Sequence, residues 1–231
     1  MPNSKKVVLI SGANRGIGYA IAEQLKSKYQ LSLGMRKPEG SPFAQSAELK
    51  SFYYEASDDS SAEKWVNASL KQFGRIDALI NCAGILRKVK FNPEEVDRLE
   101  ELWEVNVRGP WFLSSLCLEE LKKHSGKIIN VSSLSGKRVA GASGGGYAMS
   151  KFALTAMSHA LRHECWESGV RVTNLCPGFV NTDMVKEIAT IDQSEMIQVE
   201  DLASTVEHLL ELPKTMSISD LTVNCRLESL Y

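Results

Sequence analysis

The stretch VVLISGANRGIG, residues 7–18, joins a short apolar run to a loop that contains three glycines. Gly12 follows the apolar run, and Gly16 and Gly18 open a segment of helical periodicity. Glycines between a strand and a helix let a pyrophosphate approach the backbone N–H groups at the helix N-terminus. An ordinary strand-to-helix turn would tolerate the same glycines, so the loop indicates a nucleotide site only together with other features.

Short apolar, β-rich runs alternate with longer helical segments along the rest of the chain, as in βαβ units. Several of these runs are apolar without alternation, which is typical of a sheet covered by helices on both faces. The pattern predicts an α/β fold: a doubly wound, Rossmann-like parallel sheet of about seven strands with helices on both faces. The expected strands are residues 7–11, 30–35, 51–55, 78–81, 127–132, 170–175 and 220–224. The expected helices are residues 17–28, 60–73, 94–105, 108–124, 147–168 and 200–211.

The chain has 231 residues, of which 43% are hydrophobic and 24% charged, with a formal net charge of -1. No proline-rich or strongly charged linker divides it, so we expect a single domain over residues 1–231 that combines the cofactor and substrate sites. The near-zero net charge argues against bulk binding to nucleic acid. No apolar run is long enough to span a membrane, and the five cysteines lack disulfide or zinc spacing. We therefore expect a cytoplasmic protein with no metal, no nucleic-acid partner and no membrane partner.

The end of the second expected strand, in LSLGMRKPEG, lacks the acidic residue that commonly holds the adenosine ribose about 20 residues past the glycines. Arg36 and Lys37 stand there instead. A guanidinium suits a 2'-phosphate, which a carboxylate would repel. Arg36 could equally be a solvated loop charge, but Arg15 in the glycine loop offers a second cation to the same end of a cofactor. Arg15 and Arg36 together predict a preference for NADP(H) over NAD(H).

In GYAMSK, Tyr147 and Lys151 are four residues apart and so lie on one face of a helix. A nearby ammonium lowers the pKa of a tyrosine from its ordinary ~10, which suits proton transfer near neutral pH. An ordinary exposed helix pair has the same spacing. Upstream, the expected strand 127–132 leads to Ser132 and Ser133, and substrates of open α/β sheets bind off such strand ends. A serine hydroxyl there could hydrogen-bond a substrate carbonyl oxygen or simply cap the strand end.

Taken in order, these motifs resemble the short-chain dehydrogenase/reductase family over essentially the whole chain. Several motifs in register are far more specific than any one of them. The resemblance implies an oxidoreductase that transfers a hydride between NADP(H) and a small-molecule carbonyl or alcohol substrate. The matching segments are SGANRGIG for the TGxxxGIG cofactor loop, NCAG at residues 81–84 for NNAG, Asn106 in EVNVRG, NVSS, the YxxxK pair, and PGFVNT at residues 177–182.

The resemblance implies roles for four catalytic residues, Asn106, Ser133, Tyr147 and Lys151. Tyr147 would protonate the carbonyl oxygen as hydride arrives, or act as the base in the reverse direction. Lys151 would lower the pKa of Tyr147 and hold the nicotinamide ribose. Ser133 would orient the carbonyl, and Asn106 would support a water in a proton relay from Lys151. The expected substrate contacts are Ser133, Tyr147 and Phe179.

The resemblance also implies a set of cofactor contacts, in which Thr182 would meet the nicotinamide carboxamide and Tyr147 and Lys151 also take part. The other expected contacts are Gly12, Asn14, Arg15, Gly16, Ile17, Gly18, Arg36, Asp58, Asn81, Ala83, Gly84, Pro177, Gly178 and Val180. Two assignments have alternatives. Either Glu55 or Asp58 would meet the adenine, and either Ser133 or Ser135 would face the carbonyl, although the position at the strand end favours Ser133.

The chain departs from the family pattern at Cys82, where a weakly polar thiol replaces the second asparagine of NNAG. The segment 183–199 would form a short substrate lid, and nothing in the sequence selects the substrate. By resemblance, the long expected helices 108–124 and 147–168 imply a homodimer or homotetramer. The alternative is a catalytically inactive dinucleotide-binding regulatory protein of the same fold, which would usually lose the Ser, Tyr or Lys that this chain keeps.

Overall fold

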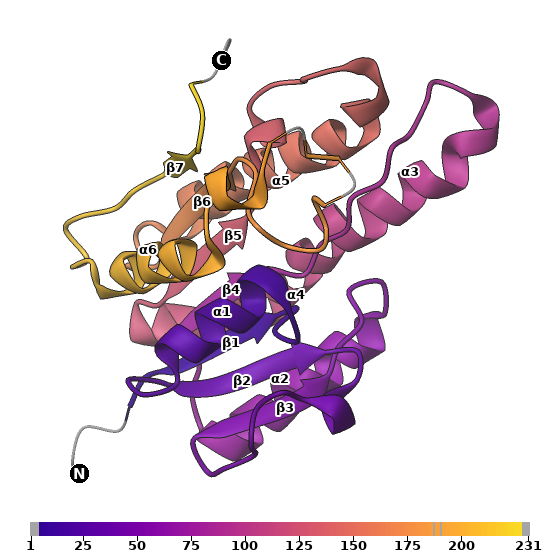
Figure 1. The fold of residues 1–231 in the computed structure, drawn as a ribbon. Coiled ribbons are helices and arrows are strands. Elements are labelled where there is room, and N and C mark those ends of the chain that lie inside the picture. The colour runs from indigo at the N-terminus through magenta and orange to yellow at the C-terminus, as the bar shows by residue number, and fades with distance from the viewer. Residues whose placement is uncertain (1–4, 187, 190, 228–231) are drawn as a thin grey trace.

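The structure is a computed structural model that describes residues 5–186, 188–189 and 191–227. The strands are β1 (Val7–Ser11), β2 (Gln30–Met35), β3 (Leu49–Tyr53), β4 (Ala78–Asn81), β5 (Lys127–Val131), β6 (Arg171–Pro177) and β7 (Asp220–Val223). They form one sheet in the order β3-β2-β1-β4-β5-β6-β7, and every neighbouring pair is parallel (Figure 1). The predicted doubly wound sheet is therefore confirmed. Because the strand order reverses between β1 and β4, a crevice is expected at their carboxyl ends.

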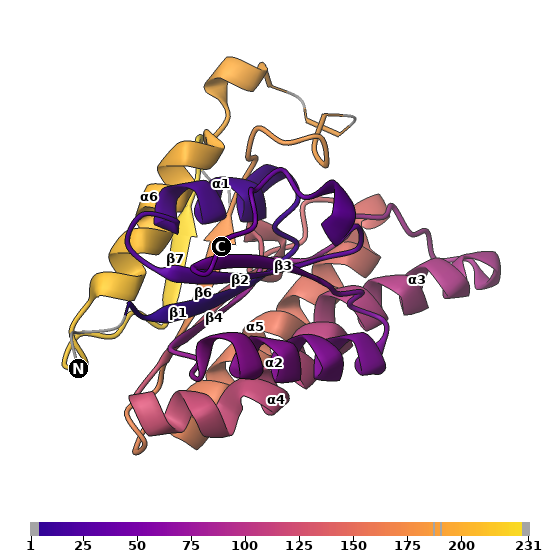
Figure 2. The ribbon, with the colours of Figure 1, turned by 90° about the horizontal axis from the view of Figure 1, so that it is seen from below.

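Helices cover both faces of the sheet, as Figure 2 shows. The helices are α1 (Gly16–Leu25), α2 (Asp59–Phe73), α3 (Val96–Trp103), α4 (Gly109–His124), α5 (Gly145–Cys165) and α6 (Val199–Glu211). α1 and α6 pack on one face and enclose one hydrophobic core. α2, α4 and α5 pack on the other face and enclose a second core. Since both faces are buried, the strands carry the continuous apolar runs seen in the sequence.

A π turn, Glu104–Arg108, joins α3 to α4, so the two helices expected at 94–105 and 108–124 form one continuous rod. In this turn the Gly109 N–H bonds the Glu104 carbonyl, five residues back. Pro110 follows directly and has no N–H of its own to offer the helix ladder. The wider turn accommodates this proline without ending the helix.

The third strand is two residues earlier than the expected 51–55. Glu55 has already left the strand, because its N–H donates to the hydroxyl of Ser61 in α2 at 3.0 Å. The other elements lie within three residues of their expected bounds.

Trp65 of α2 packs directly on the backbone of β2. Its indole is 1% exposed, and Nε1 donates to the hydroxyl of Ser32 at 2.9 Å. A Cβ on Gly34 would lie 2.6 Å from two carbons of the indole ring. Because Gly34 has no side chain, α2 can lie this close to β2. This strand leads to the cationic residues that are expected to bind the cofactor.

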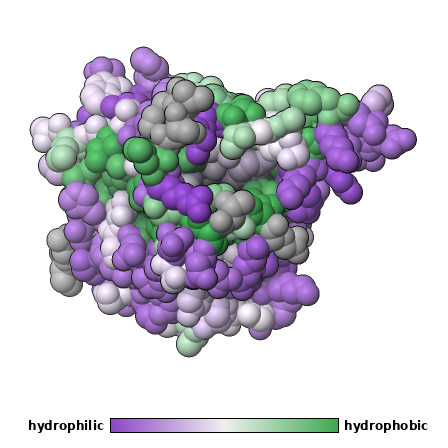
Figure 3. Space-filling view, turned by 45° about the horizontal axis from the view of Figure 1, so that its top comes forward, coloured by the Kyte–Doolittle hydropathy of each residue, from purple (hydrophilic) through white to green (hydrophobic). Residues whose placement is uncertain are grey.

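The amino-terminal end of α3 projects from the rest of the molecule (Figures 1 and 3). In the space-filling view this end forms a lobe whose tip is largely hydrophilic. Phe91, in the segment before α3, is 89% exposed. Within the described ranges no helix is both long and apolar enough to cross a membrane. The same residues contain no cluster of three or more His, Cys, Asp or Glu side chains that could hold a metal ion.

Candidate active site

The glycine loop forms a tight turn at the carboxyl end of β1. Gly12 and Gly16 have φ of 72° and 57°, a region that residues with a side chain rarely adopt. A Cβ on Gly12 would lie 2.9 Å from the Cα of Ala83, and a Cβ on Gly18 would lie 2.3 Å from the carbonyl oxygen of Gly12. These glycines therefore bring the turn against the end of β4 and leave a cradle that side chains would fill.

The amino-terminal end of α1 opens at this turn. Its N-cap residue, Arg15, makes no side-chain capping bond, and its first turn contains no acidic residue. The first N–H groups of a helix have no partner within the helix, and the helix dipole makes this end positive. An uncapped helix end beside a glycine cradle fits the pyrophosphate of a dinucleotide. Asn14 and Ile17, two of the expected cofactor contacts, lie in this loop and in the first turn of α1.

Ser11 ties the glycine loop to the end of β4. Its hydroxyl accepts hydrogen bonds from the N–H of Cys82 at 3.0 Å and of Ala83 at 3.1 Å, and donates to the carbonyl of Ile80 at 3.4 Å. Residues 82 and 83 thereby lie against the turn at Gly12. Ser11 stands at the threonine position of the TGxxxGIG motif, and it was not among the site residues expected from the sequence.

Asn81 directs its amide into the protein interior. Its Nδ2 donates to the Oδ1 of Asn130 at 2.8 Å and to the hydroxyl of Ser114 at 3.0 Å. The residue is buried between the sheet and α4. The structure thus places the Asn81 side chain beneath the site, while Ala83 and Gly84 carry the chain out of β4 along its edge.

Tyr147 lies in the first turn of α5, where Ser133 is close enough to lower the pKa of its hydroxyl. Ser133 follows β5 and caps the 3-10 turn Leu134–Gly136, its hydroxyl accepting the N–H of Ser135 at 3.1 Å. Of the two serines considered from the sequence, Ser133 is therefore the one beside the tyrosine. Burial raises the pKa of Tyr147 to about 12 and outweighs the lowering by Ser133, which is opposite to the lowered pKa expected from Lys151.

Lys151 follows one helical turn later, on the same face of α5. Its Nζ lies 5.8 Å from the centroid of the Tyr147 ring and donates to the carbonyl of Val131 at 3.1 Å. The residue is only 5% exposed. Burial lowers the pKa of this ammonium to about 8, against the opposing influence of the Cys82 and Cys176 thiols. An ammonium with a pKa this close to neutral can lose or gain a proton at physiological pH, and this one lies beside a phenol ring.

Asn106 lies in the π turn and clamps the segment that leaves β4. Its Oδ1 accepts the N–H of Ile85 at 2.9 Å, and its Nδ2 donates to the carbonyl of Ile85 at 2.9 Å and the hydroxyl of Ser150 at 3.1 Å. A Cβ on Gly84 would lie 3.2 Å from the Asn106 Oδ1 and 3.6 Å from the Lys151 Nζ. Gly84 therefore lies between two of the expected catalytic residues.

The segment after β6 returns to the glycine loop. A Cβ on Gly16 would lie 3.3 Å from the Thr182 Cγ2, so Thr182 borders the amino-terminal end of α1. Val180 pairs with Ile197 in an isolated parallel bridge, and the Phe179 carbonyl accepts the Ile197 N–H at 3.0 Å. The bridge fixes both ends of the expected lid, 183–199. Residues 187 and 190 of that lid lie outside the described residues.

Arg36 extends from the carboxyl end of β2 and is 69% exposed, with its Nε 3.8 Å from the carboxylate of Glu55. Asp58, the other acid considered for the adenine, is the N-cap of α2 and accepts the N–H of Ser60 at 3.0 Å. Glu55 thus lies nearer the strand edge than Asp58, next to the cation expected at a 2'-phosphate.

Arg15 is exposed at the start of α1. Its neighbour across the crevice is Asp183, the first residue after Thr182. The Lys186 ammonium and, more weakly, the Arg15 guanidinium lower the pKa of the Asp183 carboxyl. Arg15 therefore lies between the glycine loop and the beginning of the expected lid.

These residues come from the carboxyl ends of β1, β2, β4, β5 and β6, from α5 and from the π turn. The glycine loop has no side chains at Gly12, Gly16 and Gly18, and Gly84 lies between it and the Lys151 ammonium. The glycine loop and the uncapped end of α1 therefore fit a nicotinamide dinucleotide.

A family model described as short chain dehydrogenase matches residues 6–193. An agropine synthesis reductase of Rhizobium rhizogenes is 37% identical over 231 residues, which covers 97% of this chain and 54% of the relative. The chain thus spans about half the length of the two agropine synthesis reductases that it matches. Farnesol dehydrogenase of Aedes aegypti is 29% identical over 235 residues, covering 94% of this chain and 95% of the relative.

Two solved structures are similar over nearly the whole chain. The alcohol dehydrogenase of the archaeon Thermococcus sibiricus, complexed with 5-hydroxy-NADP, has a TM-score of 0.81 and 28% identity, covering 95% of this chain and 96% of its own. The 3-ketoacyl-(acyl-carrier-protein) reductase of Brucella melitensis, complexed with NADH, has a TM-score of 0.84 at 23% identity, covering 96% and 98%. At that identity the second likeness shows the fold alone.

Proposed function

Because this chain belongs to the short chain dehydrogenase family, we propose that it is an oxidoreductase that transfers a hydride between NADP(H) and a small carbonyl or alcohol substrate. Tyr147 is the general acid in reduction and the general base in oxidation. The names of its relatives, an agropine synthesis reductase and a farnesol dehydrogenase, are consistent with either direction.

The observation that carries this proposal is the contact among Ser133, Tyr147 and Lys151 at the end of the cradle. Ser133 is close enough to the Tyr147 hydroxyl to lower its pKa, and the Lys151 ammonium lies 5.8 Å from the ring centroid. A substrate oxygen that accepts from both hydroxyls is held in place and protonated by the same pair. A buried cation beside the phenol favours the phenolate left after proton transfer.

The chain's own residues divide the work of the reaction. Ser133 orients the substrate oxygen, Tyr147 exchanges the proton with it, and Lys151 stabilises the phenolate. Asn106 fixes the Gly84–Ile85 backbone beside Lys151, where a water could return the proton. The dinucleotide supplies or accepts the hydride when it is bound.

The preference for NADP(H) rests on Arg15 and Arg36, which extend from the loop after β1 and from the end of β2. These strands are neighbours, with Ser11 opposite Gly34, so both cations belong to the same end of the crevice. A guanidinium matches a 2'-phosphate in charge and geometry. The NADP derivative in the Thermococcus sibiricus alcohol dehydrogenase supports this choice. Glu55, 3.8 Å from Arg36, or Asp58 would meet the adenine beside it.

The decisive experiment is a spectrophotometric screen of the purified chain. NADPH oxidation is followed over a panel of aldehydes and ketones, and the reverse reaction over alcohols. We expect turnover of at least one carbonyl compound, with a higher kcat/KM for NADPH than for NADH. Equal values or a preference for NADH would contradict the cofactor assignment, and no turnover with either cofactor would contradict the enzymatic one.

The remaining expectations concern assembly and location. We propose one domain, with the segment 183–199 as a short lid, and a homodimer or homotetramer formed through α4 and α5. Trp111 on α4 and Met149 and Phe152 on α5 are exposed large apolar side chains that support such an interface. The five cysteines are free thiols, which fits the reducing cytoplasm. A monomer mass by light scattering would reject the assembly.

A further inference from the structure

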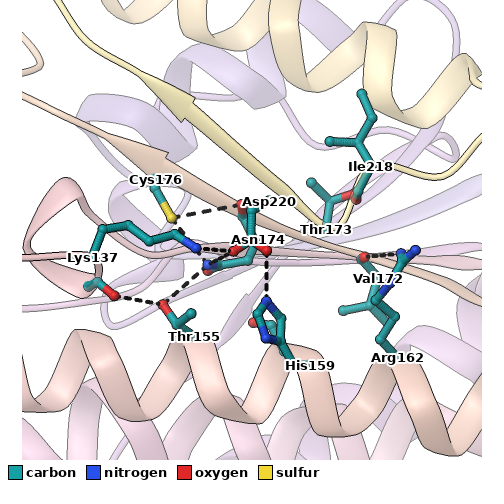
Figure 4. Close-up of polar contacts among 12 residues, drawn as sticks. Lys137, Thr155, His159, Arg162, Val172, Thr173, Asn174, Cys176, Ile218 and Asp220 are labelled. Carbon is teal, nitrogen blue, oxygen red and sulfur yellow. Dashed lines mark hydrogen bonds and ion pairs between the residues drawn. The ribbon is translucent and has the colours of Figure 1, made fainter. Parts of the chain in front are cut away.

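The carboxylate of Asp220, the first residue of β7, joins three elements next to the catalytic residues (Figure 4). Its Oδ1 accepts from the Lys137 Nζ at 2.5 Å and from the Asn174 Nδ2 at 2.8 Å. Its Oδ2 lies 2.7 Å from the His159 Nε2. Lys137 ends the turn that Ser133 begins, Asn174 is in β6, and His159 is in α5. One side chain therefore connects the catalytic turn, the sheet and the catalytic helix.

Asn174 extends this connection to Thr155, as Figure 4 also shows. The Asn174 Nδ2 lies 3.2 Å from the Thr155 hydroxyl oxygen, which accepts the bond. The hydroxyl proton of Thr155 is then available for a hydrogen bond to a backbone carbonyl. The Thr155 Oγ1 lies 3.0 Å from the carbonyl oxygen of Lys151 and 3.4 Å from that of Gly136. Thr155 thus lies between the backbone of the catalytic lysine and the turn that follows Ser133.

Asp220 also fixes the orientation of the Asn174 side-chain amide, because its carboxylate accepts from the NH2 group. The reversed amide would place its Oδ1 against a carboxylate oxygen, and two acceptors repel each other. In the observed orientation the Asn174 Oδ1 is buried with no hydrogen-bond partner among the described residues. A buried polar atom without a partner is unfavourable, so the amide is held by what its NH2 group binds.

The register of the strands places this cluster directly beneath the site. Asp220 is opposite Asn174, and Asn174 is opposite Asn130 in β5. Asn130 precedes Val131, whose carbonyl accepts the hydrogen bond of the Lys151 ammonium. The cluster therefore lies one residue below the level at which Lys151 is held.

We propose that Asp220 is a positioning residue for proton transfer, which holds the turn carrying Ser133 in register with the part of α5 that carries Tyr147 and Lys151. Asp220 acts on the turn through Lys137. It acts on both the turn and α5 through Asn174 and Thr155. The proposal rests on the proposed function, in which Ser133 and Tyr147 share the substrate oxygen. The Lys151 ammonium stays anchored to the Val131 carbonyl of β5, and the glycine loop shares none of these contacts, so replacing Asp220 should change NADPH affinity little.

The test compares Asp220→Ala with the wild type in turnover and in cofactor binding. Since an error of about 1 Å in a catalytic contact costs on the order of 100-fold, we expect kcat to fall by about tenfold to hundredfold. The Kd of NADPH, measured by fluorescence titration, should stay within about twofold. Because the bond from Ser133 lowers the pKa of Tyr147, its loosening should also move the pH profile of kcat to higher pH. An unchanged kcat, or an equal loss of NADPH affinity, would overturn the proposal.

Thr155 gives a second and milder test if Asp220→Ala does not fold. Thr155→Val keeps the shape but removes the hydroxyl, and should lower kcat in the same direction. Thr155→Ser keeps the hydroxyl and should restore most of the activity. Equal kcat values for the two variants would contradict the role of the hydroxyl, whatever their stability.

Asp77→Asn is the matched control for a general loss of stability. Asp77 is a buried carboxylate at the amino-terminal end of the central strand β4, where it accepts from Arg75 at 2.8 Å and from the N–H of Val7 at 2.8 Å. It should lose thermal stability and keep its kcat. A comparable loss of kcat in Asp77→Asn would show that destabilisation alone explains Asp220→Ala.

The wild type and Tyr147→Phe separate this inference from the proposed function. If the wild type reduces a carbonyl compound and Tyr147→Phe does not, an active Asp220→Ala overturns the positioning role alone. If the wild type turns over no carbonyl or alcohol with either cofactor, the proposed function fails, and the positioning role fails with it.

Discussion

The ammonium of Lys151 lies 5.8 Å from the centroid of the Tyr147 ring, and its hydrogen bond goes to the backbone carbonyl of Val131. The lysine is therefore anchored to β5 while its charge acts on the ring. Because it is held by the sheet, it keeps its place when the tyrosine hydroxyl exchanges a proton. The first predictions concern this pair.

Replacing Tyr147 by Phe should abolish turnover and leave NADPH binding intact. The substitution removes the only atom that exchanges a proton with the substrate oxygen and preserves the ring that packs in α5. A loss of at least about 100-fold in kcat is expected for a general acid. Steady-state kinetics and fluorescence titration of NADPH measure the two effects separately. Residual activity near the wild-type value in a folded variant would refute the assignment of Tyr147.

Replacing Lys151 by Met should lower both turnover and cofactor affinity. The ammonium favours the phenolate, and in the proposed function it also holds the nicotinamide ribose. Methionine has a similar length and no charge, so packing around the buried stem is largely kept. We expect kcat to fall by about tenfold or more, together with a higher Kd for NADPH. An unchanged Kd would remove the ribose role and leave the effect on Tyr147 to be judged from kcat.

The pKa of Lys151 predicts how stability depends on pH in the absence of cofactor. Burial lowers this pKa to about 8, whereas an unfolded lysine has a pKa of ~10.4. Between these values the unfolded chain binds a proton that the folded chain does not, so the free energy of unfolding rises with pH. The rise amounts to about 3 kcal/mol across the window.

Denaturant unfolding of the wild type and of Lys151→Met, from pH 7.5 to 10, measures this contribution. The thiols and tyrosines that also titrate there are common to both chains, and those that do not interact with Lys151 cancel in the difference. The wild type should gain stability relative to Lys151→Met as the pH rises. A constant difference between the two chains would show that Lys151 is not held at a lowered pKa.

Arg15 and Arg36 should carry the discrimination between the two cofactors. Each substitution by Ala should raise the KM of NADPH by about tenfold, the effect expected when one charge-assisted hydrogen bond is lost. The KM of NADH should change little. Lys37→Ala is the matched control, since Lys37 follows Arg36 directly and is not needed by the proposal. Equal losses for NADPH and NADH would indicate a contact to the pyrophosphate instead of the 2'-phosphate.

Gly34→Ala should destabilise the protein by overpacking. The new methyl group would lie 2.6 Å from the ring of Trp65, which is fully buried and cannot retreat. Added groups in a packed core typically cost about 1–3 kcal/mol. Gly40→Ala is the control, because a Cβ there meets nothing within 4 Å. Thermal denaturation of the two variants compares them, and equal melting temperatures would contradict the close approach of α2.

The features that could be predicted from the sequence are those whose residues lie close together along the chain. The glycine loop and the Tyr147–Lys151 spacing each lie within a few residues, and the alternation of strands and helices predicted the doubly wound parallel sheet. The π turn gave no local periodic pattern, and Pro110 was its one hint. Asp220 and Lys137 are 83 residues apart, so no motif contains both. Asn174, a polar residue inside the otherwise apolar end of β6, was the available sign that a buried network lay there.

Asp220 begins the last strand of the sheet, and this has a consequence for the order in which the protein matures. A ribosome adds about 5–20 residues per second, so β1 to β4 emerge several seconds before β7. The glycine loop and the end of β4 belong to that first portion, whereas the anchor of the catalytic turn is synthesised later. A growing chain thus contains the loop for the pyrophosphate before it contains the residue that fixes the catalytic turn.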